Sequence, residues 1–95
     1  MKTGARVQTE HVVIYSAPSL SGTFRCACIV GKKVHKSAVI RHRIQRRLRE
    51  ACKQCMVAIS GAYDIVVIAK KQHIQLMDMQ EIIHEIKGGI QKTTS

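Results

Sequence analysis

The sequence has few aromatic and few acidic residues. Phenylalanine, tryptophan and tyrosine make up 3% of its 95 residues, which argues against a module that reads bases mainly by stacking them on aromatic side chains. Six acidic residues stand against 16 lysines and arginines, so the formal net charge is +10. Because self-repulsion of this size disfavours a compact chain, we expect a polyanionic partner. Nucleic acid is the leading candidate, ahead of an anionic membrane surface and an acidic protein.

Long apolar runs are also missing. No stretch approaches the roughly 18 apolar residues that a membrane span requires, and residues 1–20 lack the apolar core of a targeting signal. We therefore expect no membrane partner and a cytoplasmic protein whose four cysteines stay reduced. Apolar residues still make up 45% of the chain, too many for a disordered basic tail, and the length predicts a single domain over 1–95.

Three segments have the residue pattern of strands. Residues 5–16 are predicted to form one or two strands, with a bend near Thr9 and Glu10. In residues 24–30, alternate side chains face opposite sides of the predicted strand. Residues 63–69 are almost unbroken in their apolar character, which predicts a strand buried on both faces.

Two further segments have helical spacing. A long helix is predicted from about Ser37 to Ile59, with Gly61 as its C-terminal cap. A second helix is predicted over residues 76–87, ended by the pair Gly88-Gly89. Apolar residues in steps of three and four form one stripe on the long helix: Ile40, Ile44, Leu48, Ala51, Cys52, Cys55, Met56 and Ile59.

The order of these elements predicts an α+β fold, a small two-layer sandwich in which helices pack on one antiparallel or mixed sheet. If strands 24–30 and 63–69 are parallel, the long helix is the crossover of a βαβ unit. Such crossovers are usually right-handed.

Basic residues concentrate on the long helix and on the connector before it. Nine of the sixteen fall between positions 32 and 53, opposed only by Glu50. Arginine forks bind phosphate oxygens in pairs, so a rod that is apolar on one side and cationic on the other suits nucleic acid. A merely solvated face would carry more acidic partners, and a membrane helix would need the apolar side that packs on the sheet. We therefore predict an RNA-binding surface made of Lys32, Lys33, Lys36, Arg41, His42, Arg43, Arg46, Arg47, Arg49 and Lys53.

The run from Lys32 to Glu50 (KKVHKSAVIRHRIQRRLRE) resembles the signature of the bacterial ribonuclease P protein. That signature passes from a double lysine through Ala-Val to an Arg-Asn-Arg triplet, a basic pair and Arg-Glu. The segment Tyr63 to Lys70 (YDIVVIAK) is similar to the next strand of the family. The resemblance covers about residues 4–87.

The resemblance implies a non-catalytic subunit of an endoribonuclease. Family proteins bind a large catalytic RNA, and together with it they remove the 5′ leader of precursor tRNA by phosphodiester hydrolysis. The implied partners are the catalytic RNA, with one protein per RNA, and precursor tRNA. The catalytic centre and its Mg²⁺ belong to the RNA, so no cofactor is expected on the protein alone. The family's βαβ crossover is left-handed, against the general rule.

Two departures from the family pattern stand out. His42 occupies the position of the usual asparagine, and an imidazole cannot present the paired donor and acceptor of an amide. Family members also carry a preceding helix, with basic residues and a phenylalanine, that helps to wall the leader-binding cleft. Here only the few residues up to Arg6 precede the central part of the first predicted strand, which fits either a truncated chain or a natural short form.

Other groups of residues point more weakly to chemistry. Cys26, Cys28, Cys52 and Cys55 could supply four thiolates to zinc, but all four lie inside regular elements, so core packing is the favoured interpretation and no metal site is predicted. No nucleophile–base pair or carboxylate dyad is apparent, so no catalytic residue is predicted. Two rival hypotheses remain: a structural RNA-binding protein of ribosomal type, and a zinc-dependent interaction module.

Overall fold

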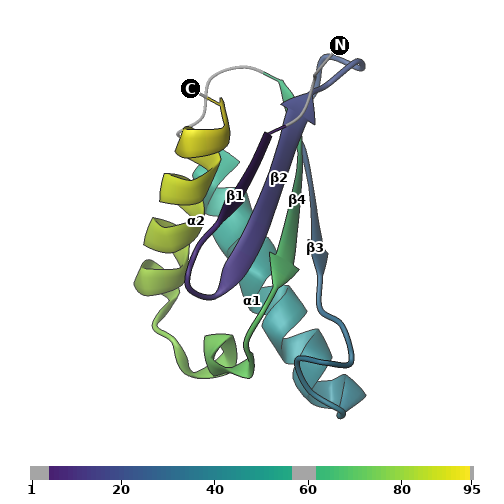
Figure 1. Cartoon of the computed structure of the whole chain (residues 1–95), viewed down its shortest axis with the longest axis vertical. Coiled ribbons are helices and arrows are strands. Elements are labelled where there is room, and N and C mark those ends of the chain that lie inside the picture. The colour runs from purple at the N-terminus through teal and green to yellow at the C-terminus, as the bar shows by residue number, and fades with distance from the viewer. Residues whose placement is uncertain (1–4, 57–61, 95) are drawn as a thin grey trace.

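The computed structural model describes residues 5–56 and 62–94 and shows two layers, a sheet and two helices that both lie against one face of it (Figure 1). The order of strands and helices is the predicted one. None of the described helices is long and apolar enough to cross a membrane. The elements are β1 (Ala5–Gln8), β2 (Val12–Pro18), β3 (Arg25–Ile29), α1 (Ala38–Met56), β4 (Tyr63–Ala69), the short 3-10 helix η1 (Gln72–Leu76) and α2 (Met79–Thr94).

The sheet is mixed, and its four strands lie in the order β1-β2-β4-β3. β2 pairs antiparallel with both β1 and β4, whereas β3 pairs parallel with β4. The predicted bend joins β1 to β2, where the Thr9 N–H donates to the Val12 carbonyl at 2.9 Å. The predicted α+β sandwich with a mixed sheet is therefore confirmed.

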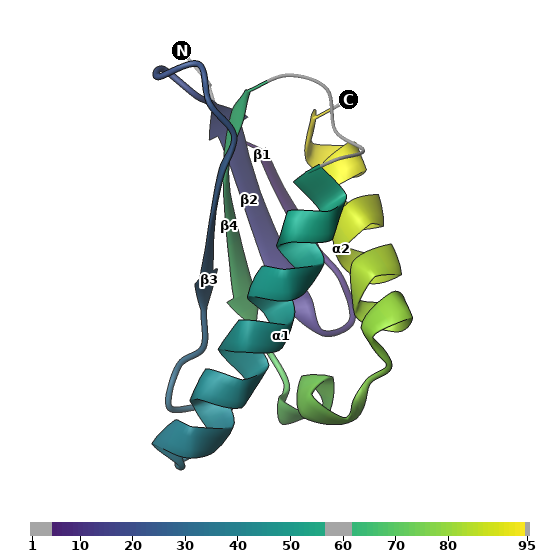
Figure 2. The ribbon, with the colours of Figure 1, turned by 180° about the vertical axis from the view of Figure 1, so that it is seen from behind.

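The helix α1 connects the parallel strands β3 and β4, and the connection is left-handed. In Figure 2, α1 lies in front of the sheet, both strands run downwards, and β4 lies to the right of β3. An observer who looks along the sheet from β3 towards β4 therefore sees the chain turn counterclockwise as it moves away, which defines a left-handed connection. The general preference for right-handed crossovers fails here, and the left-handed form implied by the resemblance is confirmed.

The core lies between the sheet and the helices. Successive side chains of a strand face opposite sides, so every second residue of the central strands points into this core. Val12 and Ile14 of β2, and Ile65, Val67 and Ala69 of β4, are all buried. The inner face of the sheet is therefore apolar along both central strands except at the buried Ser16 of β2, whose hydroxyl donates to the Thr93 carbonyl of α2 at 3.4 Å.

The predicted apolar stripe of α1 packs on this face. Ile44 and Leu48 are completely buried, while Met56 at the end of the helix is 38% exposed. Ile59 and the predicted cap Gly61 lie outside the described residues. The buried members of the stripe are Ile44, Leu48, Ala51, Cys52 and Cys55, with Ile40 packed at its edge.

β4 is buried on one face only, so the prediction of two buried faces is wrong. Ile65, Val67 and Ala69 are buried, whereas Val66 and Ile68 are partly exposed. The physical reason is the layering: both described helices cover the same side of the sheet (Figure 2). The apolar run marks a central strand, and it leaves an open sheet face on the side away from the helices.

The predicted bounds of the last helix are also wrong. Residues 72–76 form η1, and α2 then runs from Met79 through the double glycine to Thr94. Ile90, just beyond the glycines, is completely buried. A Cβ at Gly89 would overlap Cδ1 of Ile14 and would lie 3.4 Å from Cγ1 of Val7. Glycine at this position therefore lets α2 approach the sheet closely and does not end the helix.

Candidate nucleic-acid interface

The connector before α1 is held against the helix by its own hydrogen bonds. Ser37 caps the first turn, because its hydroxyl oxygen accepts from the Ile40 N–H at 3.4 Å. Nδ1 of His35 accepts from the Ser37 N–H at 3.0 Å. Nη1 of Arg41 donates to the carbonyls of His35 and Lys36, at 3.0 and 2.8 Å. These bonds fix the lysine-bearing connector relative to the start of α1.

Two side chains then fix α1 relative to its neighbours. Nε2 of Gln45 donates to the Cys28 carbonyl on β3 at 2.8 Å. On the other flank, Nε of Arg47 donates to the Ile74 carbonyl of η1 at 3.2 Å, and its Nη2 donates to the Met77 carbonyl. The helix is therefore attached to the edge strand and to the η1 segment by polar contacts, in addition to its apolar stripe.

The predicted RNA-binding residues fall into two groups. Arg41 and Arg47 are half-buried and bond to backbone carbonyls of the protein itself. In residues 5–56 and 62–94, no acidic side chain forms an ion pair with any member of the predicted set. Eight members are exposed and form what we call the basic surface: Lys32, Lys33, Lys36, His42, Arg43, Arg46, Arg49 and Lys53.

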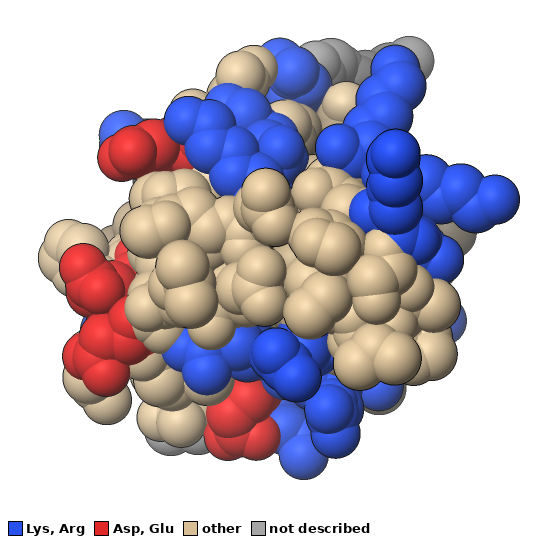
Figure 3. All heavy atoms as spheres, turned by 90° about the horizontal axis from the view of Figure 1, so that it is seen from below, with Lys and Arg blue, Asp and Glu red and all other residues tan. Residues whose placement is uncertain are grey.

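Charge is distributed unevenly over the molecule. Figure 3 views the end where α1 begins; lysine and arginine side chains project at its right, the side on which α1 begins in Figure 1, and form further groups at the top and bottom of the view. Acidic side chains in this view lie mainly towards the opposite edge, on the side of α2. A polyanion that approaches from the connector side therefore meets cationic groups first.

Arg46 lies between two hollows of the basic surface. One is lined by Val39, His42, Gln45 and Arg49 as well as by Arg46, and it encloses about 440 Å³. The other lies on the opposite flank and is lined by Arg43, Arg46, Arg47, Glu50 and Met79, with about 270 Å³. Of the predicted residues, Arg46 alone is shared by these two hollows. Its side chain is therefore accessible from both flanks of α1.

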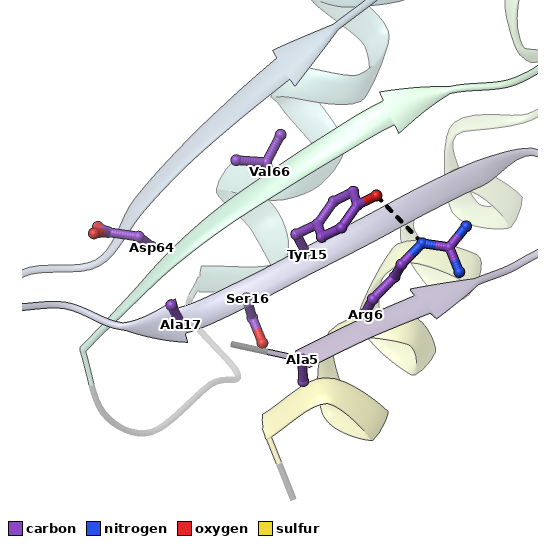
Figure 4. Close-up of a pocket in the computed structure, with 7 residues that line it drawn as sticks. All are labelled: Ala5, Arg6, Tyr15, Ser16, Ala17, Asp64 and Val66. Carbon is purple, nitrogen blue, oxygen red and sulfur yellow. Dashed lines mark hydrogen bonds between the residues drawn. The ribbon is translucent and has the colours of Figure 1, made fainter. Parts of the chain in front are cut away.

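A third hollow lies on the open sheet face, away from α1 (Figure 4). Tyr15 is 42% exposed there, and its hydroxyl accepts from Nε of Arg6 at 3.2 Å. The Arg6 guanidinium also lies 5.9 Å from the centre of the Tyr15 ring. The floor is completed by small or apolar residues such as Ala17 and Val66. The result is a shallow surface that combines one ring with one cation.

An exposed ion pair borders this hollow. Nε and Nη2 of Arg25 on β3 donate to the two carboxylate oxygens of Asp64 on β4, at 2.9 and 3.0 Å. The hydrogen bond and the charge of Asp64 raise the pKa of Arg25, and the same hydrogen bond lowers the pKa of Asp64. Since Arg25 and Asp64 are register partners, the pair links the parallel strands directly.

The four cysteines do not form one group. The sulfur atoms of Cys26, Cys28 and Cys52 all lie within 4.8 Å of one another. Cys55 is turned away, and its thiol donates to the Ile83 carbonyl of α2 at 3.7 Å. A site made of all four thiols, the arrangement considered from the sequence, is therefore not what the fold builds.

Comparison with known proteins agrees with this architecture. The Ribonuclease P family model matches residues 1–94 of the chain. The chain belongs to the ribonuclease P protein family. Among curated members, the ribonuclease P protein component of Exiguobacterium sibiricum is 32% identical over 85 residues, which cover 88% of this chain and 72% of the relative. The component of Pelotomaculum thermopropionicum is 33% identical over 79 residues, covering 83% of this chain and 70% of the relative.

Solved structures of ribonuclease P proteins share the fold. The Staphylococcus aureus protein superposes with a TM-score of 0.74 at 30% identity, over 94% of this chain and 80% of its own. The Thermotoga maritima protein superposes with a TM-score of 0.82 at 21% identity, over 97% of this chain and 86% of its own. The second likeness concerns the fold alone. The family named from the residue pattern is thus confirmed.

Some features of the surface were outside the sequence prediction. Arg6 was not assigned to any surface, and its placement beside Tyr15 depends on the β1–β2 pairing, in which the two are register partners. Val39 is 68% exposed next to the cationic side chains, although it precedes the apolar stripe. Helical spacing could have predicted the exposure of Val39, since this residue does not fall on the apolar stripe of α1.

Proposed function

We propose that this protein is the protein subunit of ribonuclease P and that it binds the catalytic RNA through its basic surface. One observation carries the proposal: in a chain of this family, the side chains of the basic surface are exposed and form no ion pair with an acidic side chain within the described residues. Such charges repel one another until an anion approaches. Phosphates of the RNA would remove that repulsion and release counterions.

In this proposal the protein supplies binding and the RNA supplies the chemistry. The RNA, with its Mg²⁺, hydrolyses the phosphodiester bond that joins the 5′ leader to precursor tRNA. The arginine forks of the basic surface stabilise the folded RNA by bidentate contacts to phosphate oxygens. The rigid attachment of α1 through Gln45 and Arg47 supports such a role, because it fixes the spacing of the cations. The cytoplasmic location stays a prediction.

We further propose that the open sheet face contacts the 5′ leader. A single strand can stack a base on the exposed Tyr15 ring while Arg6 neutralises a neighbouring phosphate. The basic surface and this hollow lie on different sides of the molecule, since α1 covers the other face of the sheet (Figure 2). The catalytic RNA and the leader could therefore be bound at the same time.

The test uses the reconstituted holoenzyme. Cleavage of precursor tRNA at low Mg²⁺ by a catalytic RNA of the family is measured with and without the protein, for wild type, Arg46→Ala and Lys71→Ala. Lys71 is an exposed lysine outside the basic surface, so its variant controls for the loss of one charge. We expect the wild type and Lys71→Ala to stimulate cleavage. Arg46→Ala should bind the RNA more weakly and reduce the slope of log affinity against log salt by about one.

Equal RNA affinity and equal salt slopes for Arg46→Ala and the wild type would contradict the assignment of the surface. A folded wild type that binds RNA but leaves cleavage unchanged would favour the structural RNA-binding protein of ribosomal type. For the leader, we expect Tyr15→Ala to weaken the binding of precursor tRNA with a long leader more than that of mature tRNA. Tyr15→Phe, which keeps the ring, is the matched control, and an equal effect on both substrates would refute the leader contact.

A further inference from the structure

Three thiols converge beneath α1, on the inner side of the sheet. Cys26 and Cys28 stand two residues apart on β3, so their side chains lie on the same face of the strand. Cys52 approaches them from α1, and its sulfur lies 3.9 Å from that of Cys28. All three sulfur atoms fit within 4.8 Å of one another. Strand and helix thus present three soft donors to one point, although 24 residues separate Cys28 from Cys52.

These separations suit a tetrahedral thiolate site. Zinc–sulfur bonds of about 2.3 Å place two sulfur ligands roughly 3.8 Å apart at the corners of a tetrahedron. The distance between the sulfur atoms of Cys28 and Cys52, 3.9 Å, is already close to this value. The three sulfur atoms lie within 4.8 Å of one another, so the widest pair would have to approach by at most about 1 Å, which a change of side-chain torsion angles can supply.

The site also has access and a suitable electrostatic setting. Cys28 and Cys52 are buried, but Cys26 is only half-buried because β3 is an edge strand of the sheet. An ion can therefore enter from the Cys26 side, where a water molecule could complete its coordination. Three thiolates and one divalent ion carry a net charge of −1, and the cationic Arg49 lies close enough to Cys28 to act on it electrostatically.

We propose that Cys26, Cys28 and Cys52 form a binding site for a thiophilic divalent ion of the Zn²⁺ class, with three thiolate ligands and one water. Binding replaces the thiol protons by the metal and releases them to solvent. The ion links β3 to α1 close to the hydrogen bond that Gln45 of α1 donates to the Cys28 carbonyl of β3. It therefore stabilises the attachment of the helix that bears the basic surface. This proposal revises the expectation that the cysteines serve core packing alone, and it does not depend on RNA binding.

The experiment titrates the full chain, reduced and kept free of oxygen, with Co²⁺ as a spectroscopic probe and then with Zn²⁺. We expect thiolate-to-cobalt charge-transfer absorption that saturates at one ion per chain and is abolished when Zn²⁺ displaces Co²⁺. Cys26→Ser should lose this stoichiometric signal. Cys26 is the least buried of the three, so its replacement is the least damaging to the core. Cys55→Ser is the matched control, because it removes a thiol from the same region without touching the group, and it should keep the signal.

A second measurement avoids the question of whether a variant folds. The wild type is alkylated at its cysteines under mildly denaturing conditions, with and without Zn²⁺, and the modified positions are mapped by mass spectrometry. We expect Zn²⁺ to slow modification of Cys26, Cys28 and Cys52 more than that of Cys55. The proposal is overturned if the wild type shows no saturable cobalt spectrum, if Cys26→Ser binds Co²⁺ as tightly as the wild type, or if Zn²⁺ protects all four thiols equally.

Discussion

The adjacent glycines of α2 offer a sharp test of how the helix packs. Gly88 and Gly89 have the same helical setting, but a Cβ at position 88 would meet nothing within 4 Å, whereas one at position 89 would overlap Cδ1 of the buried Ile14. Replacing glycine by alanine inside a helix gains about 1 kcal/mol from backbone propensity. Forcing an extra methyl group into a packed core costs about 1–3 kcal/mol. The first effect acts at both positions and the second acts only at position 89.

We therefore expect Gly88→Ala to raise the free energy of unfolding by about 1 kcal/mol, and Gly89→Ala to leave it unchanged or lower it by up to about 2 kcal/mol. The difference between the two variants, about 1–3 kcal/mol, is independent of the propensity value. Urea denaturation followed by circular dichroism measures it, and the midpoint temperatures should differ by about 4–8 °C per kcal/mol for a chain of this size. If Gly89→Ala proved as stable as Gly88→Ala, α2 would not approach β2 as closely as described, and the double glycine would need another explanation.

Two further predictions concern polar contacts. Burial opposes ionisation of Glu85, but hydrogen bonds from Thr9 and His11 outweigh this effect and hold the pKa of Glu85 below its ordinary value of 4.5. The ionised Glu85 therefore stabilises the folded protein above pH 4.5, and this contribution is lost as the pH falls through the lowered pKa. Glu85→Gln should cost about 1 kcal/mol at pH 7, and urea denaturation at several pH values should show the gap to the wild type closing in acid; a gap that stays constant would contradict the linkage. Arg47→Ala should lower stability by about 1–3 kcal/mol, since the Ile74 and Met77 carbonyls lose their donor. Faster amide exchange in residues 72–78 would locate the effect, whereas unchanged stability would show that Arg47 is free to bind RNA.

Local patterns predicted much of the fold. The alternation in residues 24–30 and the stripe on α1 correspond to single faces of single elements, and such faces follow directly from the period of the strand or helix. The burial of β4 could not be obtained in this way. An apolar run says that a strand is central, but whether one or two layers cover it depends on where the helices go. Here both cross to the same side, so Val66 and Ile68 remain partly exposed.

The end of α2 was mispredicted for a related reason. Glycine has two uses in helices, as a terminating residue and as a place where backbones approach closely, and sequence alone does not distinguish them. The contact between Gly89 and Ile14 joins residues 75 positions apart, and it decides the matter in favour of the second use. The grouping of three thiols depends likewise on the pairing of β3 with α1, which no local spacing reveals.

The candidate site shows the same limit in its charges. Counting basic residues along α1 treats its arginines as equivalent, yet the fold gives them different tasks. Arg41 and Arg47 donate to carbonyls of the connector and the η1 segment, whereas Arg46 and Arg49 remain exposed beside a hollow. Two of the predicted cations thus shape the surface that the others present. If this division is right, loss of an inward arginine should lower stability and leave the salt slope of RNA binding almost unchanged, while loss of an outward arginine should do the reverse. The two kinds of arginine can therefore be separated by measuring stability and salt dependence on the same variants.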